Sequence, residues 1–332
     1  MSLHGHVYER RLVWRHRIGQ FFEWACRLAT LLALGILGLL LLSIGRQAIG
    51  WLDWGFLTRS NSYEAREAGI MAGLMGSLWL VGLTAIMSVP LGVGAAVYLE
   101  EYAKPTRLTK FIQLNISNLA GVPSIVYGIL GFTVFVRMFG MMDRPEEFEC
   151  SLGFASFTFH LPLGRVVLSG ACTLALLSLP VVIIASQEAL RAVPASIRHA
   201  SLALGATKWQ TIRHQVLPAA LPGILTGVIL SLSRVIGETA PLAVLGAPAQ
   251  LSYAPGSIEG VGDALQHPSK ILQAPFDQFT TIPLQIYGWI NETKPVFEHV
   301  ASAGIVVLLA VLLMMNGAAI FIRQRFQKSI RW

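Results

Sequence analysis

Residues 193–223 read VPASIRHASLALGATKWQTIRHQVLPAALPG and lie between two long apolar stretches. Pro194 suits the first position of a helix, where its missing N–H costs no hydrogen bond. Gly205, eleven residues later, suits the left-handed position that follows a helix. Thr207 can then cap a second short helix, which Pro218 would end. The stretch therefore predicts a helix, a glycine turn and a second helix between two neighbouring apolar elements.

The sequence around this stretch has the composition of a membrane protein. Of 332 residues, 54% are hydrophobic and 13% are charged, whereas about 25% are charged in a soluble domain. The mean hydropathy is +0.60. A water-soluble globule could not cover so much apolar surface, which excludes a soluble enzyme, a disordered chain and a fibrous protein. The three cysteines are scattered and predict neither a disulfide framework nor a CxxC metal site.

Six apolar stretches are long enough to cross a bilayer, since about 18 or more apolar residues indicate a membrane helix. They cover residues 28–45, 68–99, 111–136, 166–187, 217–246 and 300–322. The fifth stretch is the only one that contains ionised groups, Arg234 and Glu238. We therefore expect an all-α polytopic membrane protein with about six transmembrane helices.

The basic residues predict the orientation of these spans. Six spans place both termini on one side, and if that side is the cytoplasm, the inner segments hold sixteen Lys and Arg in about 79 residues, against eight in about 104 outside. The inner segments are 1–27, 98–110, 188–216 and 323–332, and the outer ones are 46–67, 137–165 and 247–299. This asymmetry follows the positive-inside rule. The net charge of +7 therefore indicates topology and not nucleic-acid binding.

This topology divides the chain into four parts. They are a cytoplasmic segment (1–27), an anchor helix with an outer loop (28–67), a core (68–323) whose inner loop is 188–218, and a cytoplasmic tail (324–332). The first apolar stretch is interpreted as a retained anchor, because five arginines precede it and no small-residue cleavage signature follows.

Two outer segments are less regular. Six prolines in 246–298 make one long helix there unexpected, and the uncharged part 279–290 is a candidate re-entrant segment. Residues 138–165 are compatible with a strand, a short interfacial helix or a loop. Inside the third span, residues 121–124 interrupt the helix, and such breaks either line substrate paths in transporters or are simple kinks.

Arg234 and Glu238 are four residues apart, so on a helix they would share one face. A charge within the membrane is kept only with a partner or a function. One interpretation is a structural ion pair at a helix interface. The other is an anion site, because a guanidinium offers a planar fork that fits two oxygens of phosphate. Glu238 would hold the fork and accept a hydrogen bond from a protonated phosphate oxygen, which sulfate lacks at neutral pH.

Other patterns indicate packing. Gly69 and Gly73, like Gly223 and Gly227, are small residues four apart, which let membrane helices approach closely. The aromatic residues of the outer segments are typical of an interfacial belt, and they are Trp51, Trp54, Phe56, Tyr287 and Trp289.

The inner loop resembles the EAA loop of the permease subunits of ABC importers. That loop reads Glu-Ala-Ala, three residues, Gly, nine residues and Ile-x-Leu-Pro. Ala200, Gly205 and Leu217-Pro218 keep this spacing. The chain departs from the pattern at three positions, His199, Ser201 and Gln215. Within the family the sequence is most similar to the PstA-type subunit of the phosphate importer, over residues 121–131, 189–210, 233–242 and 279–289.

The resemblance implies a MetI-like ABC-importer permease fold and a subunit that forms half of the pathway of an ATP-driven importer of inorganic phosphate in the bacterial inner membrane. It implies that Arg234 contacts the substrate, whereas the second arginine of many relatives is Ile184 here. The expected substrate-pathway residues are Arg234, Glu238 and Thr239. The residues expected to couple the chain to the ATPase are Ala200, Leu204, Gly205, Ala206, Thr207 and Trp209.

The same resemblance implies the partners. They are a similar PstC-like permease, a PstB-like ATPase dimer that carries ATP and Mg, a soluble PstS-like phosphate-binding protein, and membrane lipid. The chain has no GxxxxGK[ST], HExxH or GxSxG motif, so we expect no cofactor, metal or enzymatic activity of its own. The alternatives are an importer of another oxyanion or small solute, a membrane-embedded lipid enzyme, which the missing motifs disfavour, and a scaffold without transport.

Overall fold

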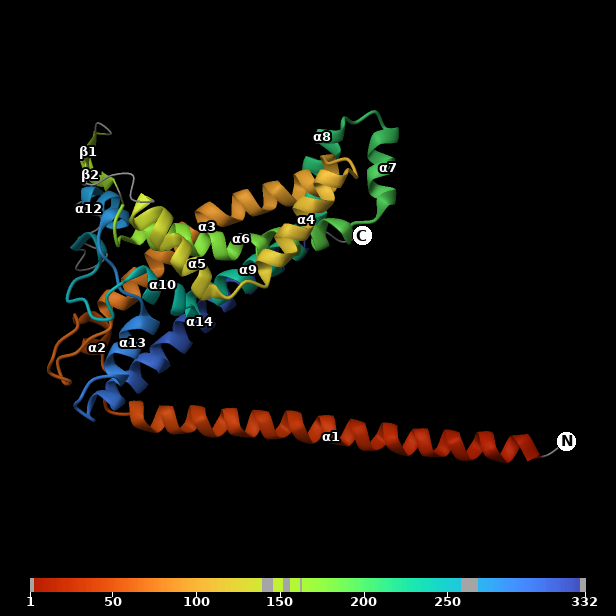
Figure 1. Cartoon of the computed structure of the whole chain (residues 1–332), viewed down its shortest axis with the longest axis horizontal. Helices are drawn as coiled ribbons and strands as arrows, with labels where there is room; N and C mark the ends of the chain where they lie inside the picture. Colours follow the sequence, from red (N-terminus) through yellow and green to blue (C-terminus); the bar gives the residue numbers. More distant parts are fainter. Residues whose placement is uncertain (1–2, 139–145, 152–155, 162, 258–267, 329–332) are drawn as a thin grey trace.

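A computed structural model describes residues 3–138, 146–151, 156–161, 163–257 and 268–328. Over this part of the chain, the protein is a bundle of long helices from which the first helix departs (Figure 1). The long helices are α1 (Leu3–Ala48), α3 (Met71–Val97), α6 (Val167–Arg191), α9 (Leu217–Gly237) and α14 (Phe297–Lys328). Each belongs to a stretch that is long and apolar enough to cross a membrane.

The sixth expected span is a pair of shorter helices, α4 (Arg107–Ala120) and α5 (Ser124–Gly131), and the π turn η2 (Phe132–Val136) continues the second. The two halves are bent by 103° where they meet. Pro123, which has no N–H to continue α4, is the cap before α5. The predicted interruption is thus confirmed, and so is the all-α membrane fold, with about six spans when the bent pair is one of them.

Close helix contacts hold the bundle together. α3 packs along α6, and α6 packs against α9. One predicted small-residue interface is present, because Gly223 and Gly227 of α9 face Ala189 and Ala185 of α6. In the other predicted pair, Gly73 lies against Gln285 and Ile282 of α13 (Ile282–Ile290), but Gly69 precedes α3 and lies against Arg59, so that pair forms no interface between two helices.

α1 runs apart from the bundle for most of its length (Figure 1). Near its end, Oε1 of Gln47 accepts a hydrogen bond from Ser302 of α14 at 2.8 Å, and Trp51 stacks on His299 of the same helix. The apolar side chains of residues 28–45 mostly face outward. This exposure suits a lipid-facing anchor.

The inner loop has the predicted helix, glycine turn and helix. They are α7 (Ala195–Ala203), Gly205 at φ +84°, and α8 (Lys208–Thr211). Thr207 caps α8 reciprocally with Gln210: the Thr207 hydroxyl accepts from the Gln210 N–H at 3.3 Å, and the Gln210 side chain accepts from the Thr207 N–H at 2.8 Å. This capping box satisfies two N–H groups that the helix itself leaves free.

Two expectations about prolines in this loop are wrong. Pro194 is the cap before α7 and not its first residue. Pro218 does not end the second helix, because α8 continues through the π turn η4 (Ile212–Val216) into α9. A π turn lengthens the hydrogen-bond spacing to five residues. Pro218 therefore enters the first turn of α9, where a missing N–H is tolerated.

The outer segments hold short elements. Residues 146–161 contain the antiparallel strands β1 (Glu146–Ser151) and β2 (Ser156–Leu161), which resolves the open question for these residues in favour of strands. No helix in the described part of 246–298 is long enough to cross a membrane, in line with the proline-rich sequence, and α13 is nine residues long. The other short elements of the outer segments are α2 (Trp54–Thr58), η5 (Pro255–Ser257), α12 (Pro268–Gln273) and η6 (Ala274–Phe276). Elsewhere in the chain, the π turn η1 (Tyr98–Tyr102) continues α3 into the inner segment 98–110, and α10 (Ala240–Leu245) follows α9.

The expected aromatic belt is only partly present. Trp54 and Tyr287 are exposed, but Phe56 and Trp289 are buried and pack against each other with ring centroids 5.9 Å apart. The indole N–H of Trp289 donates to Asn61 at 2.9 Å. The two buried rings are therefore core residues that join α2 to α13, a role that the aromatic composition alone could not show.

Candidate functional site

The helix of the fifth apolar stretch is interrupted next to its two ionised residues, Arg234 and Glu238. α9 ends at Gly237, Glu238 follows in an extended conformation, and α10 begins at Ala240. The expected uninterrupted stretch 217–246 is therefore wrong. Thr239 stands at the break, and its carbonyl accepts the first hydrogen bond of α10, from the N–H of Ala243 at 2.9 Å.

Arg234 and Glu238 form the predicted pair, although Glu238 lies beyond the helix. Nε of Arg234 donates to Oε1 of Glu238 at 3.1 Å. The side chain of Glu238 is 15% exposed, whereas that of Arg234 is 53% exposed. In this chain taken alone, the guanidinium of Arg234 therefore faces outward from the bundle, whereas the carboxylate of Glu238 is largely covered.

The pair leaves the binding end of the guanidinium open. Within the described part of the chain, the hydrogen bond to Glu238 uses only Nε of Arg234. Both terminal nitrogens stay available, and they form the fork that fits two oxygens of a carboxylate or phosphate. Glu238 therefore fixes the orientation of the guanidinium from its side without occupying the fork.

The break after α9 lies against the second half of the other broken span. Helix α5 packs on α10, and a Cβ atom at Gly128 of α5 would lie 2.7 Å from Cα of Pro241. The hydroxyl of Tyr127 donates to the Leu119 carbonyl at 2.9 Å, which ties α5 back to α4. Broken helices that meet within a membrane bundle are the usual architecture of a transporter substrate site.

The predicted coupling residues gather at the turn between α7 and α8. Leu204 is 89% exposed and Trp209 is 55% exposed. Ala200, Gly205 and Thr207 are also exposed, and Ala206 is half-buried. An apolar residue as exposed as Leu204 at the tip of a loop is typical of a protein interaction site when a second large apolar residue lies close to it.

Sequence reasoning missed the contacts that hold this loop in place. Arg198 of α7 forms an ion pair with Glu101 of η1 at 2.8 Å, and Arg191 at the end of α6 pairs with Glu100 at 2.6 Å. In the sequence, the only sign of these contacts is that two adjacent glutamates, Glu100 and Glu101, stand in an otherwise basic inner segment. The partners lie more than 90 positions away, and no periodicity links them.

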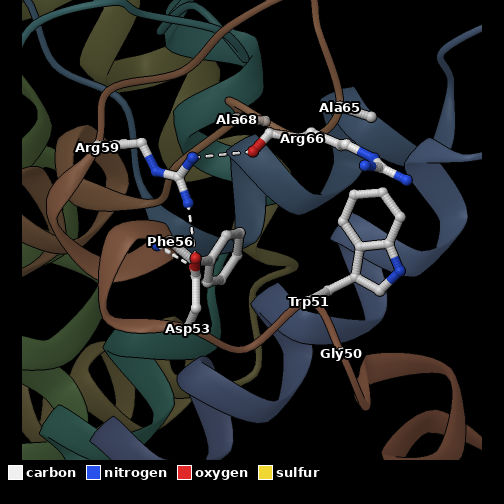
Figure 2. Close-up of a pocket in the computed structure, with 8 residues that line it drawn as sticks. All are labelled: Gly50, Trp51, Asp53, Phe56, Arg59, Ala65, Arg66 and Ala68. Carbon is white, nitrogen blue, oxygen red and sulfur yellow. Dashed lines mark hydrogen bonds and ion pairs between the residues drawn. The ribbon is translucent and has the colours of Figure 1, made fainter.

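A separate cavity of about 460 Å³ lies beside α2. Figure 2 shows Arg59, Arg66 and Trp51 among the residues that line it. Arg59 donates to Asp53 at 2.8 Å and to the Arg66 carbonyl at 2.9 Å, so its charge is already balanced. The lining residues include none of the predicted pathway residues.

Comparison with known proteins gives consistent results. The family described as "Binding-protein-dependent transport system inner membrane component" matches residues 88–331. The probable ABC transporter permease protein YqgI of Bacillus subtilis (strain 168) is 34% identical over 194 residues, which are 58% of each protein. The phosphate transport system permease protein PstA 1 of Mycobacterium tuberculosis (strain CDC 1551 / Oshkosh) is 39% identical over 59% of this chain and 56% of its own length. The chain thus spans little more than half of these relatives.

The chain is also similar to a relative over a larger share of both proteins, and to two solved structures. PstA of Haemophilus influenzae (strain ATCC 51907 / DSM 11121 / KW20 / Rd) is 30% identical over 70% of this chain and 74% of its own length. A bacterial alginate ABC transporter in complex with an alginate pentasaccharide-bound periplasmic protein matches with a TM-score of 0.60 at 14% identity, over 95% of this chain and 98% of that one. The MetNI methionine ABC transporter matches with a TM-score of 0.51 at 14% identity, over 76% and 94%. At these identities the structures show a shared fold.

Proposed function

This chain belongs to the family of binding-protein-dependent transport system inner membrane components, and on that basis we propose that it is a permease subunit of an ATP-driven importer of inorganic phosphate. The MetI-like permease fold and the family resemblance expected from the sequence are confirmed. The chain is therefore an integral protein of the inner membrane. In the proposal it forms half of the translocation pathway and hydrolyses no ATP itself.

The observation that carries the substrate proposal is the open fork of Arg234. Glu238 holds Nε at 3.1 Å and leaves the two terminal nitrogens for an anion, in a geometry that suits two phosphate oxygens. Glu238 can also accept a hydrogen bond from a protonated phosphate oxygen, and sulfate offers no such donor at neutral pH. Thr239 adds a hydroxyl at the same helix break, and we assign these three residues to the substrate pathway.

The partners follow from the two ends of the molecule. The exposed turn at Leu204 and Trp209 is suited to dock on a PstB-like ATPase dimer, which would bind ATP and Mg. A PstC-like permease would complete the pathway beside Arg234, and a PstS-like protein would deliver phosphate to the outer ends of the helices. In this arrangement residues 1–27, 188–218 and 324–332 are cytoplasmic, and lipid surrounds the anchor formed by residues 28–45.

The test is transport by the reconstituted complex. The chain is assembled with its companion permease, ATPase and binding protein in vesicles that contain ATP. Uptake of radiolabelled phosphate, sulfate and molybdate is measured separately, and that of phosphate also against a tenfold excess of each unlabelled anion. We expect ATP-dependent uptake that phosphate suppresses and sulfate does not. Uptake of sulfate in place of phosphate would reassign the substrate to another oxyanion. Absence of ATP-dependent uptake of any of the three would overturn the proposal.

A further inference from the structure

We propose that α3 is the mechanical link across this subunit: it joins the inner loop (α7, the Gly205 turn and α8) to the outer helix α13, because it is clamped to both. The inference rests on the proposed function, since it concerns how an ATPase on the inner loop and a binding protein on the outer face would influence each other. The clamps consist of Glu101 with Arg198 at the inner end and Gln285 at the outer end. None of these residues touches the substrate-pathway residues.

The inner clamp centres on Arg198 of α7. Its Nε and Nη2 donate to Oε1 of Glu101 at 3.1 and 2.8 Å. Its remaining donors reach the carbonyls of Val193 at 2.8 Å and Leu190 at 2.9 Å. Glu101 and Arg198 are only 10% and 23% exposed, so water competes poorly for these bonds. One guanidinium therefore joins α7, the end of α6 and the inner end of α3.

A second layer of contacts reinforces the inner clamp. Arg191 donates to both oxygens of Glu100, at 2.9 and 2.6 Å. Nζ of Lys208, the first residue of α8, lies 5.1 Å from the centre of the Tyr102 ring, within the range of a cation–π interaction. All these partners belong to η1, the π turn that continues α3. The inner loop thus cannot shift relative to η1 without breaking the contacts of both Arg198 and Lys208, while Arg191 holds the end of α6 to the same π turn.

The outer clamp centres on Gln285 of α13, a fully buried amide. Its Oε1 accepts from the N–H of Gly73 at 3.1 Å, and its Nε2 donates to the carbonyl of Gly69 at 2.8 Å. Gly73 lies in the first turn of α3, where helix N–H groups lack an intrahelical partner, and Gly69 precedes the helix. The hydroxyl of Ser77 accepts from the N–H of Ile282 at 3.0 Å. Hydrogen bonds between side chains and backbone groups therefore fix the start of α3 to α13.

Between the clamps the element is continuous. Residues 71–102 form 32 consecutive helical residues, a length of about 48 Å at 1.5 Å per residue. The helix continues across Pro90 and packs along α6. By contrast, α4 with α5 and α9 with α10 are interrupted near mid-length or before the outer end. A displacement of the inner loop therefore reaches the outer surface through α3 and the unbroken α6 that packs along it, whereas the broken helices are free to rearrange at the substrate site.

The first experiment measures stimulation of ATP hydrolysis by the substrate-loaded binding protein in the reconstituted complex. Glu101→Gln and Gln285→Met should each lower stimulation by at least about fivefold, the lower end of typical coupling factors, while unstimulated hydrolysis and assembly persist. Glu101→Asp, which keeps the carboxylate but shortens the side chain, should retain more stimulation than the isosteric Glu101→Gln, and a general loss of packing predicts the opposite order. Glu64→Gln is the matched control, because it removes only the exposed, 3.8 Å pair with Lys294.

The second experiment keeps the proposal testable if these variants fail to assemble. Cysteines at positions 102 and 208, whose native side chains are in contact and whose replacement leaves the Glu101–Arg198 pair intact, are joined by a short bifunctional maleimide in a chain without its native cysteines. Because the inner loop and η1 move as one body, the crosslinked complex should keep full stimulated hydrolysis. Loss of stimulation on crosslinking, or full stimulation in both assembled single variants, would overturn the link. If wild-type complex hydrolyses ATP but imports no phosphate, the substrate assignment fails and the link is still measured.

Discussion

The side chain of Glu238 lies 3.1 Å from Nε of Arg234 although the helix that carries Arg234 ends between them, at Gly237. On an unbroken helix the two residues would be neighbours on one face and the carboxylate could approach the guanidinium from any side. Here the extended backbone at Glu238 places it beside Nε. The helix break therefore determines which nitrogens of Arg234 remain free.

Arg234→Lys should lower phosphate uptake sharply. The substitution keeps the positive charge but replaces the planar fork by a single ammonium group. Loss of one charged hydrogen bond of about 1.5–3 kcal/mol predicts roughly a 10- to 100-fold decrease. The measurement is phosphate uptake normalised to the amount of assembled complex. Arg107→Lys, an exposed arginine at the start of α4, is the control and should transport normally. Normal uptake by Arg234→Lys would exclude bidentate binding.

The double variant Arg234→Leu with Glu238→Leu separates the anion site from a structural ion pair. Removing both partners of a pair that only stabilises a helix interface is often neutral, so the structural interpretation predicts normal abundance and normal uptake. The anion-site interpretation predicts normal abundance without uptake, because no fork remains. Glu238→Gln alone should impair uptake less than Arg234→Gln. Uptake by the apolar pair at the wild-type level would show that these residues do not pass phosphate.

Gly205→Val should uncouple the ATPase while the subunit still inserts. Gly205 has φ +84°, and a β-branched residue in this region costs about 1–3 kcal/mol. The turn would open and displace Leu204, so we expect weaker pull-down of the ATPase or loss of coupled uptake. Gly205→Asn is the control, because asparagine tolerates the left-handed region. Normal pull-down and coupled uptake of the valine variant would refute docking at this turn.

Local chemistry explains what could be predicted from the sequence. The turn at Gly205 and the cap at Thr207 depend on residues within a few positions of one another, and both are confirmed. The prediction that the second helix ends at Pro218 also rests on local chemistry. It fails because the π turn η4 before it places Pro218 in the first turn of α9, where a missing N–H is tolerated. The helix break after Gly237 was also missed, although Pro241 in the first turn of α10 marks a new helix start, because the apolar run on both sides was taken as one span.

Contacts between distant segments explain what could not be predicted. Gln285 lies in an aromatic, uncharged segment. Its side chain forms buried hydrogen bonds with Gly69 and Gly73, which are more than 200 positions away in the sequence. The burial of Trp289 has the same cause, since its partner Asn61 belongs to another outer segment. Composition alone could place these residues near the outer surface. It could not show that they form the core of the outer end.

The orientation can be tested by labelling single cysteines in a chain without its native ones. A cysteine at Ser257, in the outer segment 247–299, should react with a membrane-impermeant maleimide added to intact cells. A cysteine at Ser329, in the carboxyl-terminal tail, should react only after permeabilisation. The expectation follows from the excess of Lys and Arg in the inner segments. Labelling of both sites, or of Ser329 alone, in intact cells would rule out cytoplasmic termini.

Gly76→Ala should destabilise the subunit, whereas Gly82→Ala should not. Both glycines lie in α3, but a Cβ atom at Gly76 would lie 2.0 Å from the carbonyl oxygen of Thr280, and one at Gly82 would have no neighbour within 4 Å. The obstacle at Gly76 is backbone, so α3 would have to move away from the segment before α13. Overpacking of this kind costs about 1–3 kcal/mol, while alanine in an open helical position gains roughly 0.5–1 kcal/mol over glycine.

The measurement for this pair is the thermal midpoint of the purified complex in detergent, together with its yield. The midpoint of Gly76→Ala should fall below that of the wild type, and that of Gly82→Ala should equal or exceed it. The comparison is controlled for helix propensity, because the same substitution is made twice in one helix. Equal midpoints for the two variants would mean that α3 does not approach Thr280 as closely as the structure shows, and the outer clamp would then lose its geometric basis.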